Sequence, residues 1–260
     1  MFASSALEID AVDLTPRADC SDCAYRNTLL TTGSCQPGDC CVVAESGRQI
    51  DRFFKAHPAF ATSYTQDPFW ERRAIAAQYL PTNHLRPLLT DPDEAVRRVL
   101  AYRVPLEWLL ELRQDSDREV RVTVADRLPE HQLELMADDY DYLVRTYVAK
   151  RLPKGRLFRL VADPDNEVRR TVAERIPSVS LGLMAHDKEV VIRRIVAQRM
   201  DVDDLTLMSQ DSDWTVRYEV ALRAEPDLLK RMLEDSDEEV RLVAEQRLVT
   251  LALETNQNES

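Results

Sequence analysis

The stretch DPDNEVRRTVAERIP at residues 163–177 decides the fold, because close copies of it return at a fixed interval along the chain. If Asp163 is counted as position zero, apolar residues at positions five, nine and thirteen form one stripe of an α-helix. The acidic opening suits a helix N-terminus, where side-chain oxygens cap free N–H groups and negative charge favours the helix dipole. Pro177 at position fourteen is expected to end the helix.

The interval between copies is 24 residues, without insertions. Position six is arginine in every copy, position ten is alanine in seven copies, and position eighteen is always leucine. The eight copies begin at Asp67, Asp91, Asp115, Asp139, Asp163, Asp187, Asp211 and Asp235. Self-similarity at a fixed period indicates a solenoid, in which stacking of neighbours creates the core that one unit cannot form alone. The sequence therefore predicts eight repeats over residues 67–254.

The second half of each repeat carries Leu at position eighteen and Leu or Met at position twenty-one in the first seven repeats. A spacing of three without period-two alternation predicts a short helix of the 3₁₀ kind and not a strand. Methionines in this column, such as Met136 and Met184, are expected to fill the core. Pro92 and Pro164, after the first aspartate of their repeats, are expected in the first helical turn.

The arginine columns have two interpretations. On the helical wheel, position six lies beside the apolar stripe, and position twelve, arginine in seven repeats, borders its other edge. Partly buried arginines need acceptors, and the repeated aspartates and helix-end carbonyls supply them. We therefore favour an Asp–Arg ladder that joins adjacent repeats. The alternative is a groove that follows the phosphates of a nucleic acid, which the accompanying acidic residues make less favourable.

Composition limits the classes of partner. The chain has 260 residues, a formal net charge of −12 and 44% hydrophobic residues. The negative charge argues against broad attraction to nucleic acid or a membrane surface. The N-terminus has no basic start before an apolar core, and no window has the ~18–20 apolar residues of a membrane span. We therefore expect a cytoplasmic protein with no membrane association.

Motifs of catalysis are absent from the sequence. It contains no G-x-S-x-G, no P-loop, no G-x-G-x-x-G and no H-E-x-x-H. The four histidines are scattered along the chain, at His57, His84, His131 and His186. Most carboxylates belong to the caps or the solvent face of the repeat. We therefore expect that the protein is not an enzyme.

All five cysteines fall in one short segment, at Cys20, Cys23, Cys35, Cys40 and Cys41. A Cys-x2-Cys pair places two thiolates on one tight turn, and disulfides are rare in the cytosol. Adjacent side chains diverge, so the doublet is expected to supply one ligand, which leaves four thiolates in all. Four thiolates suit either zinc or a [4Fe–4S] cluster. The missing second Cys-x2-Cys knuckle favours iron–sulfur over zinc.

A family resemblance follows from the two halves together. The segments CSDC at residues 20–23, CQPGDCCV at 35–42 and ESGRQIDRFF at 45–54 resemble the iron–sulfur module of leucine-rich repeat variant (LRV) proteins. The pattern D-x-D-x-x-V-R-x-x-V-A-x-R-L-P resembles the LRV repeat. The resemblance implies an all-α fold, a right-handed superhelical solenoid of alternating α- and 3₁₀-helices with a small N-terminal [4Fe–4S] domain. Members of the family are associated with nitrogen-fixing bacteria.

The resemblance also implies a ligand set. Matched residue by residue, the family pattern places ligands at Cys20, Cys23, Cys35 and Cys41, the last directly before Val42. Cys40 occupies a variable position of that pattern and is the alternative to Cys41.

The domain organisation that we expect has four parts. Residues 1–19 form an N-terminal tail, 20–66 the cluster module and its junction, 67–254 the repeats and 255–260 a polar tail. Within the junction, residues 48–56 are expected to form a helix that Pro58 ends.

The function that we expect is noncatalytic. The repeats would bind a protein partner while the cluster carries or senses electrons, or only holds the module together. A dedicated electron carrier and a nucleic-acid-binding solenoid are the alternatives.

Overall fold

The structure is a computed structural model that describes residues 15–258. The first fourteen residues of the predicted N-terminal tail therefore lie outside the described part of the chain. Within that part the regular elements are helices, apart from one antiparallel bridge between Gln36 and Cys40. The chain divides into two compact units, residues 1–124 and 125–260, and the division falls within helix α5 (Arg118–Arg127). The predicted boundary at residue 66 lies inside unit 1.

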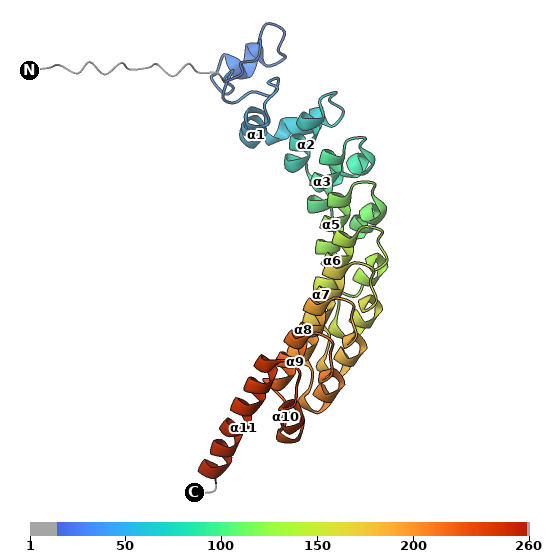
Figure 1. The fold of residues 1–260 in the computed structure, drawn as a ribbon. Coiled ribbons are helices and arrows are strands. Elements are labelled where there is room, and N and C mark those ends of the chain that lie inside the picture. The colour runs from blue at the N-terminus through green and yellow to red at the C-terminus, as the bar shows by residue number, and fades with distance from the viewer. Residues whose placement is uncertain (1–14, 259–260) are drawn as a thin grey trace, which may run out of the picture. The chain divides into compact units, whose positions relative to one another are not determined.

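Unit 1 contains the cysteine segment and the first repeats (Figure 1). Its elements are η1 (Arg26–Leu30), α1 (Gly47–Ala56), η2 (Pro58–Tyr64), α2 (Trp70–Tyr79), η3 (Thr82–His84), η4 (Arg86–Thr90), α3 (Glu94–Arg103), α4 (Leu106–Leu109) and η5 (Leu110–Gln114). Helix α1 packs on α2, and α2 packs on α3. The helix expected over residues 48–56 is confirmed as α1, which ends two residues before Pro58.

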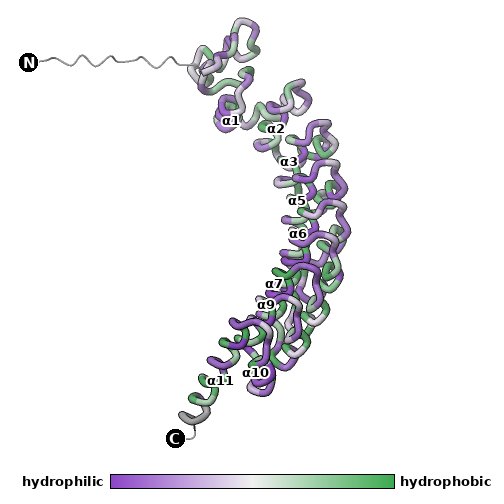
Figure 2. Tube along the Cα trace, viewed as in Figure 1, coloured by the Kyte–Doolittle hydropathy of each residue, from purple (hydrophilic) through white to green (hydrophobic). Residues whose placement is uncertain are grey.

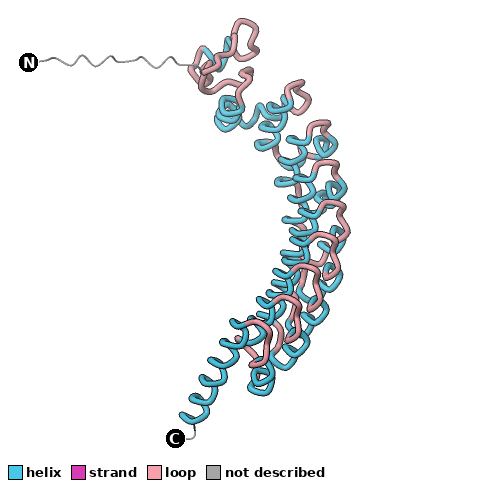
Figure 3. Tube along the Cα trace, in the orientation of Figure 1, coloured by secondary structure: helices cyan, strands magenta, loops and turns pink. Residues whose placement is uncertain are grey.

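Unit 2 alternates α-helices with short 3₁₀-helices. Figure 3 shows its helices, of both kinds, joined by short loops. After the end of α5 its elements are η6 (Leu133–Met136), α6 (Tyr142–Arg151), η7 (Lys154–Leu160), α7 (Asn166–Arg175), η8 (Ser178–Met184), α8 (Val190–Arg199), η9 (Val202–Met208), α9 (Trp214–Ala221), α10 (Pro226–Met232) and α11 (Glu238–Asn258). The predicted alternation is confirmed. It is broken where α10, which begins at Pro226, replaces a 3₁₀-helix.

The core lies where each short 3₁₀-helix packs on the α-helix that follows it, as η7 does on α7 and η8 on α8. In the repeat that begins at Asp163, Val168 and Val172 lie on one stripe of the helix and are fully buried. Leu181 and Met184 of η8, which packs on α8 of the next repeat, are also buried. Figure 2 shows apolar and polar residues alternating along the tube, as such stripes require. The core role expected for the methionine column is confirmed.

The two aspartates that open a repeat have different tasks. The second is the N-cap: Asp93 accepts a hydrogen bond from the backbone N–H of Ala95 at 2.9 Å, and Asp165 accepts one from Glu167 at 2.9 Å. The first closes the turn before the cap, because Oδ1 of Asp91 accepts the N–H of Asp93 at 2.9 Å. The sequence left open which aspartate caps the helix, and the contacts assign this task to the second.

The α-helices end two residues before the prolines at position fourteen. Helix α7 ends at Arg175, and Ile176 has the extended ψ of 145° that residues before proline adopt. Met200 has nearly the same ψ, 147°, although Asp201 follows it in place of proline. The geometry of the repeat therefore holds this conformation even where proline does not impose it.

The expectation that Pro92 and Pro164 lie in the first helical turn is wrong. Helices α3 and α7 begin at Glu94 and Asn166, so each proline precedes the N-cap. Because the second aspartate is the cap, the proline lies between the two aspartates. Its backbone carbonyl there accepts a hydrogen bond, as that of Pro92 does from Arg97 at 3.2 Å.

Helix α11 runs to Asn258, four residues into the predicted polar tail, and residues 259–260 lie outside the described part. The last repeat has Val249 at position fourteen, where five other repeats have proline, so nothing stops the helix there. Among the described helices, none combines the length and the apolar character that a membrane crossing requires.

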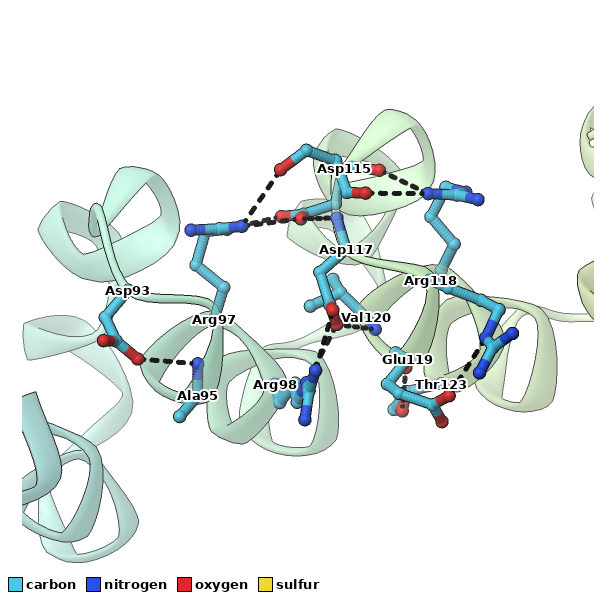
Figure 4. A network of polar contacts seen from close by, with 12 residues as sticks. Asp93, Ala95, Arg97, Arg98, Asp115, Asp117, Arg118, Glu119, Val120 and Thr123 are labelled. Carbon is cyan, nitrogen blue, oxygen red and sulfur yellow. Dashed lines mark hydrogen bonds and ion pairs between the residues drawn. The ribbon is translucent and has the colours of Figure 1, made fainter. Parts of the chain in front are cut away.

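Within each unit, position-six arginines pair with the first aspartate of the following repeat. Arg145 donates from Nε and Nη2 to the carboxylate of Asp163 at 2.7 and 2.8 Å, and both side chains are buried. Its Nη1 donates to the backbone carbonyl of Asp139, the first residue of its own repeat, at 2.8 Å. Figure 4 shows the same arrangement in unit 1, where Arg97 donates to Asp115 at 2.7 and 2.9 Å. The predicted Asp–Arg ladder is confirmed.

Five position-twelve arginines bind the end of the preceding α-helix, namely Arg103, Arg151, Arg175, Arg199 and Arg223. Arg199 donates to the backbone carbonyls of Ala173 and, at 2.9 Å, of Ile176. These carbonyls belong to the last turn and the cap of α7, where acceptors lack a partner within the helix. The first repeat has Tyr79 at this position, and its hydroxyl donates to Asp51 at 2.7 Å instead.

The ladder predicts a loss of stability in acid. Hydrogen bonds from Arg217 lower the pKa of Asp235 most. Burial raises it by a smaller amount, so the net pKa lies below its ordinary value. For Asp91 and Asp211 burial raises the pKa most, but hydrogen bonds outweigh it and the net pKa is again lowered. Because the folded-state pKa lies below the unfolded value of about 3.9, this contribution is complete above that pH. It is lost as the pH falls through the folded-state pKa.

Urea titrations from pH 5 to pH 2 are expected to show a falling free energy of unfolding, by about 1.4 kcal/mol for each unit of pKa depression. The variant Asp235→Asn, whose side chain does not titrate, should show a shallower fall over the same range. An equal slope in the two proteins would assign the acid sensitivity to other carboxylates.

Candidate metal centre

The first cysteine pair lies on one tight turn, as the sequence predicts. The backbone N–H of Cys23 donates to the carbonyl of Cys20 at 3.3 Å, which closes the turn. The N–H of Arg26 then donates to the carbonyl of Cys23 at 3.0 Å. The π-helical turn η1 begins at Arg26. Both thiols are partly exposed.

The other three cysteines flank a small antiparallel bridge. Gln36 and Cys40 pair through two backbone hydrogen bonds of 2.8 and 2.9 Å. Cys35 and Cys41 are the next residues outward, so they oppose each other across the two chain segments. Opposed residues share a face of a ladder, whereas successive residues alternate between faces. Cys41 therefore shares the face of Cys35, and Cys40 lies on the opposite face with Gln36.

Cys40 differs in burial from the cysteines on either side of it, Cys35 and Cys41. Cys35 and Cys41 are buried, whereas Cys40 is partly exposed. Burial raises the pKa of the Cys35 thiol most, and the charges of Cys23, Cys41, Cys20 and Cys40 raise it further, in that order. Burial also raises the pKa of the Cys20 thiol most, and the charges of Cys41 and Cys23 raise it further. Of the other thiols, only Cys41 affects Cys40, whose pKa is raised mainly by burial. These charge effects indicate that Cys20, Cys23, Cys35 and Cys41 lie near one another and that Cys40 lies near Cys35 and Cys41.

Two glycines with positive φ shape the loops that carry the ligands. Gly33 has φ of 70° two residues before Cys35, and Gly38 has φ of 89° inside the bridge loop. A Cβ at Gly38 would lie 3.3 Å from Cγ of Arg17, whereas a Cβ at Gly33 would meet no atom within 4 Å. Backbone strain and a tight contact therefore both require glycine at position 38.

Replacing Gly38 by alanine is expected to destabilise unit 1 by about 1–2 kcal/mol, because the left-handed conformation is strained for any residue with a Cβ. Urea titration followed by tryptophan fluorescence would measure the change. Gly155→Ala is the matched control: its φ is not positive and its Cβ would meet open space. An effect of Gly38→Ala no larger than that of the control would contradict the assignment of strain.

An aromatic cluster covers the segment from the side of α1. The ring of Phe53 lies 5.5 Å from that of Tyr25 and 6.1 Å from that of Phe60, measured between centroids. His57 lies 5.2 Å from Phe53 and donates from Nε2 to the backbone carbonyl of Ser34 at 2.8 Å. A carbonyl can only accept, so this nitrogen carries the proton. The cluster packs Tyr25 of the cysteine segment on α1, and His57 anchors the residue before Cys35.

Sequence reasoning missed two residues that hold the loops in place, His57 and Gln49. Gln49 is fully buried, and its backbone carbonyl accepts the N–H of Cys41 at 3.1 Å. A signal was present in the sequence. Gln49, Phe53 and His57 are spaced i, i+4, i+8, so two polar residues share the apolar stripe of a short helix.

The donor set fits an iron–sulfur group. All five cysteines lie in one short segment, two of them buried and three partly exposed, and none of them forms a disulfide. The raised pKa values mean that ligand binding must release protons from the thiols. In the described part of the chain, no three His, Cys, Asp or Glu side chains form a ready-made metal site.

Two family models match the chain. One, described as the LRV protein FeS4 cluster, matches residues 16–63, which contain all five cysteines and α1. The other, described as leucine rich repeat variant, matches residues 142–165, which begin at α6. These matches fall on the cluster module and on the repeats that the sequence resemblance indicates.

Whole-chain comparison gives the same assignment. A solved structure titled "a leucine-rich repeat variant with a novel repetitive protein structural motif" is 56% identical, with a TM-score of 0.81, over 90% of this chain and 100% of that one. This match confirms the predicted solenoid of alternating α- and 3₁₀-helices.

A curated relative, described as an uncharacterized 27.7 kDa protein in the nifB 3' region of Rhodobacter capsulatus, is 37% identical over 89 residues. The match covers 34% of this chain and 36% of that protein, so it spans about a third of the relative's length. Together with the solved structure and the matched cysteine segment, it leads to one conclusion: the chain belongs to the leucine-rich repeat variant proteins with an N-terminal iron–sulfur cluster domain.

Proposed function

We propose that the N-terminal module binds a [4Fe–4S] cluster through Cys20, Cys23, Cys35 and Cys41. The observation that carries this proposal is the bridge between Gln36 and Cys40, which places Cys41 on the same face as Cys35. The tight Cys20–Cys23 turn adds support. When bound, such a cluster supplies one-electron chemistry, at a potential set by burial and by hydrogen bonds to sulfur.

The module has one partly exposed side and one buried side. Cys20 and Cys23 are partly exposed, whereas Cys35 and Cys41 are buried. An electron would therefore enter or leave through the Cys20–Cys23 turn. This asymmetry suits a cluster that carries or senses electrons better than one that only ties the chain together.

The repeats are proposed to bind a protein partner without catalysing a reaction. In unit 2, Leu135, Leu183 and Leu207 all lie at position twenty of their repeats and are 63%, 65% and 58% exposed. Exposed apolar residues that recur on one layer are typical of protein-binding surfaces. The arginine columns give nucleic acid little support, because their N–H groups donate to carboxylates and backbone carbonyls. A role near nitrogen fixation accords with the position of the Rhodobacter capsulatus relative.

Anaerobic purification tests the cofactor. Iron, acid-labile sulfide and zinc would be measured together with the visible absorption spectrum. About four iron and four sulfide per chain are expected from the composition of the cluster. Zinc without labile sulfide would refute the iron–sulfur assignment.

Partner binding tests the sensing role. The apo, oxidised and reduced proteins would each be immobilised, and the affinity of each captured partner compared. A variant with Leu183→Asp and Leu207→Asp is expected to lose the partner while it keeps its cluster. Identical affinity in the three cluster states would remove the sensing role and leave a constitutive scaffold.

A further inference from the structure

We infer that Gln49 is a positioning residue, whose side-chain amide holds the first and the last cluster ligands at the spacing that the cluster needs. This inference rests on the proposed ligand set. Gln49 is the third residue of α1 and is fully buried, although it carries a polar amide. A buried amide needs partners for both its N–H donors and its carbonyl acceptor.

The partners of Gln49 come from two separate segments. Its Nε2 donates to the backbone carbonyl of Pro16 at 2.7 Å, and its Oε1 accepts the backbone N–H of Gly38 at 3.1 Å. A carbonyl only accepts and an N–H only donates, so these partners fix the orientation of the amide. Pro16 lies four residues before Cys20, and Gly38 lies three residues before Cys41. One side chain therefore joins the approach to the first ligand with the approach to the last.

The backbone of Gln49 adds a third contact, because its carbonyl accepts the N–H of Cys41 at 3.1 Å. Residues 15–20 form no helix or strand, so the chain before Cys20 has no ladder of its own to fix it. Gly38 lies in the left-handed region, and its N–H points away from the bridge toward α1. The rigid helix thus serves as the template on which two irregular segments are placed.

Only a neutral amide meets this combination of demands. An ionised glutamate has no N–H, so it would face the carbonyl of Pro16 with a second acceptor. A methionine of similar length would leave both backbone groups without a partner. Each change is expected to loosen the ligand loops without touching a thiol.

The test uses the full chain as Gln49→Glu and Gln49→Met, with Arg48→Gln as the control, because Arg48 is the exposed neighbour on the same helix. The first readout is the rate at which an iron chelator removes iron from the anaerobically purified protein. The second is amide hydrogen exchange of Gly38 and Cys41 in the apoprotein, compared with Leu100 in α3.

Iron release and exchange at Gly38 and Cys41 are expected to rise at least about fivefold in both Gln49 variants. The control and the exchange of Leu100 should stay unchanged. Rates within twofold of the wild type, or an equal rise at Leu100, would overturn the positioning role. If the wild-type chain assembles no cluster, the proposed function fails, and the exchange of the two loop amides still decides the role of Gln49.

Discussion

Replacing Arg169 by methionine is expected to lower the free energy of unfolding of unit 2 by about 3–5 kcal/mol. Arg169 donates to both carboxylate oxygens of Asp187, at 2.7 and 3.1 Å, and to the backbone carbonyl of Asp163 at 2.8 Å. Both side chains of the pair are 5% exposed. Methionine keeps the apolar stem but leaves the Asp187 carboxylate buried without its counter-charge. Urea unfolding followed by circular dichroism would measure the change.

The neighbouring residue provides a matched control. The side chain of Arg170 is 50% exposed and pairs with Glu174 of the same helix at 3.2 Å. Exposed pairs contribute about 0–1 kcal/mol, so Arg170→Met should have at most that effect. The double variant Arg169→Met with Asp187→Asn should regain part of the loss, because the buried charge is removed as well. A cost below about 1 kcal/mol for Arg169→Met would show that water reaches the ladder.

Much of the repeat fold follows from the sequence because every repeat solves the same packing problem. Val168 and Val172 are buried in the structure because positions five and nine lie on one helical face. The ladder was also predictable, since an arginine beside an apolar stripe needs an acceptor and an aspartate recurs in each repeat. The spacing of the apolar residues and the recurring Asp and Arg residues therefore specify both the core and the Asp–Arg ladder beside it.

Competition among nearby hydrogen bonds set the details that the sequence left open or got wrong. Both aspartates at the start of a repeat can cap a helix, and the carboxylate of Asp91, which closes the turn, is also bound by Arg73 at 2.8 and 2.9 Å. That contact comes from the preceding repeat, so no local pattern reveals it. Pro92 was expected inside the first turn of the helix, but it lies two residues before Glu94, the first residue of α3. Helix α11 extends beyond its predicted end because Val249 stands where five other repeats have the proline that ends the helix.

The candidate site divides in the same way into local and distant contacts. The Cys20–Cys23 turn involves only neighbours in sequence, and its spacing predicts it. The anchoring of the loops depends on Gln49 and His57, which lie eight and sixteen residues beyond Cys41. Cysteine spacing cannot show which polar residues of a later helix turn back toward the loops. The choice between Cys40 and Cys41 depends on the register of a single bridge, which the resemblance suggested and the bridge supports.

Alanine at Cys41 is expected to abolish cluster binding, whereas alanine at Cys40 should leave it intact. Changes beside a metal ligand already cost about 10–100-fold in affinity, so loss of a ligand should reduce the iron retained at least about tenfold. Cys40 lies on the face opposite Cys35, and its thiol makes only a weak contact, 3.9 Å from the carbonyl of Ser34. Iron and sulfide analysis of the anaerobically purified variants would measure both outcomes.

The two variants form a matched pair, because they remove the same atom from adjacent residues of one segment. Global stability of the repeats should be equal in both, as their thermal unfolding would show. Cluster loss in Cys40→Ala alone would mean that the bridge register changes when the cluster binds. Loss in both would mean that the doublet acts as a unit, and loss in neither would place the fourth ligand elsewhere. Because the bridge fixes which of the two faces Cys35, selective loss in Cys41→Ala would tie the ligand choice to a single backbone pairing.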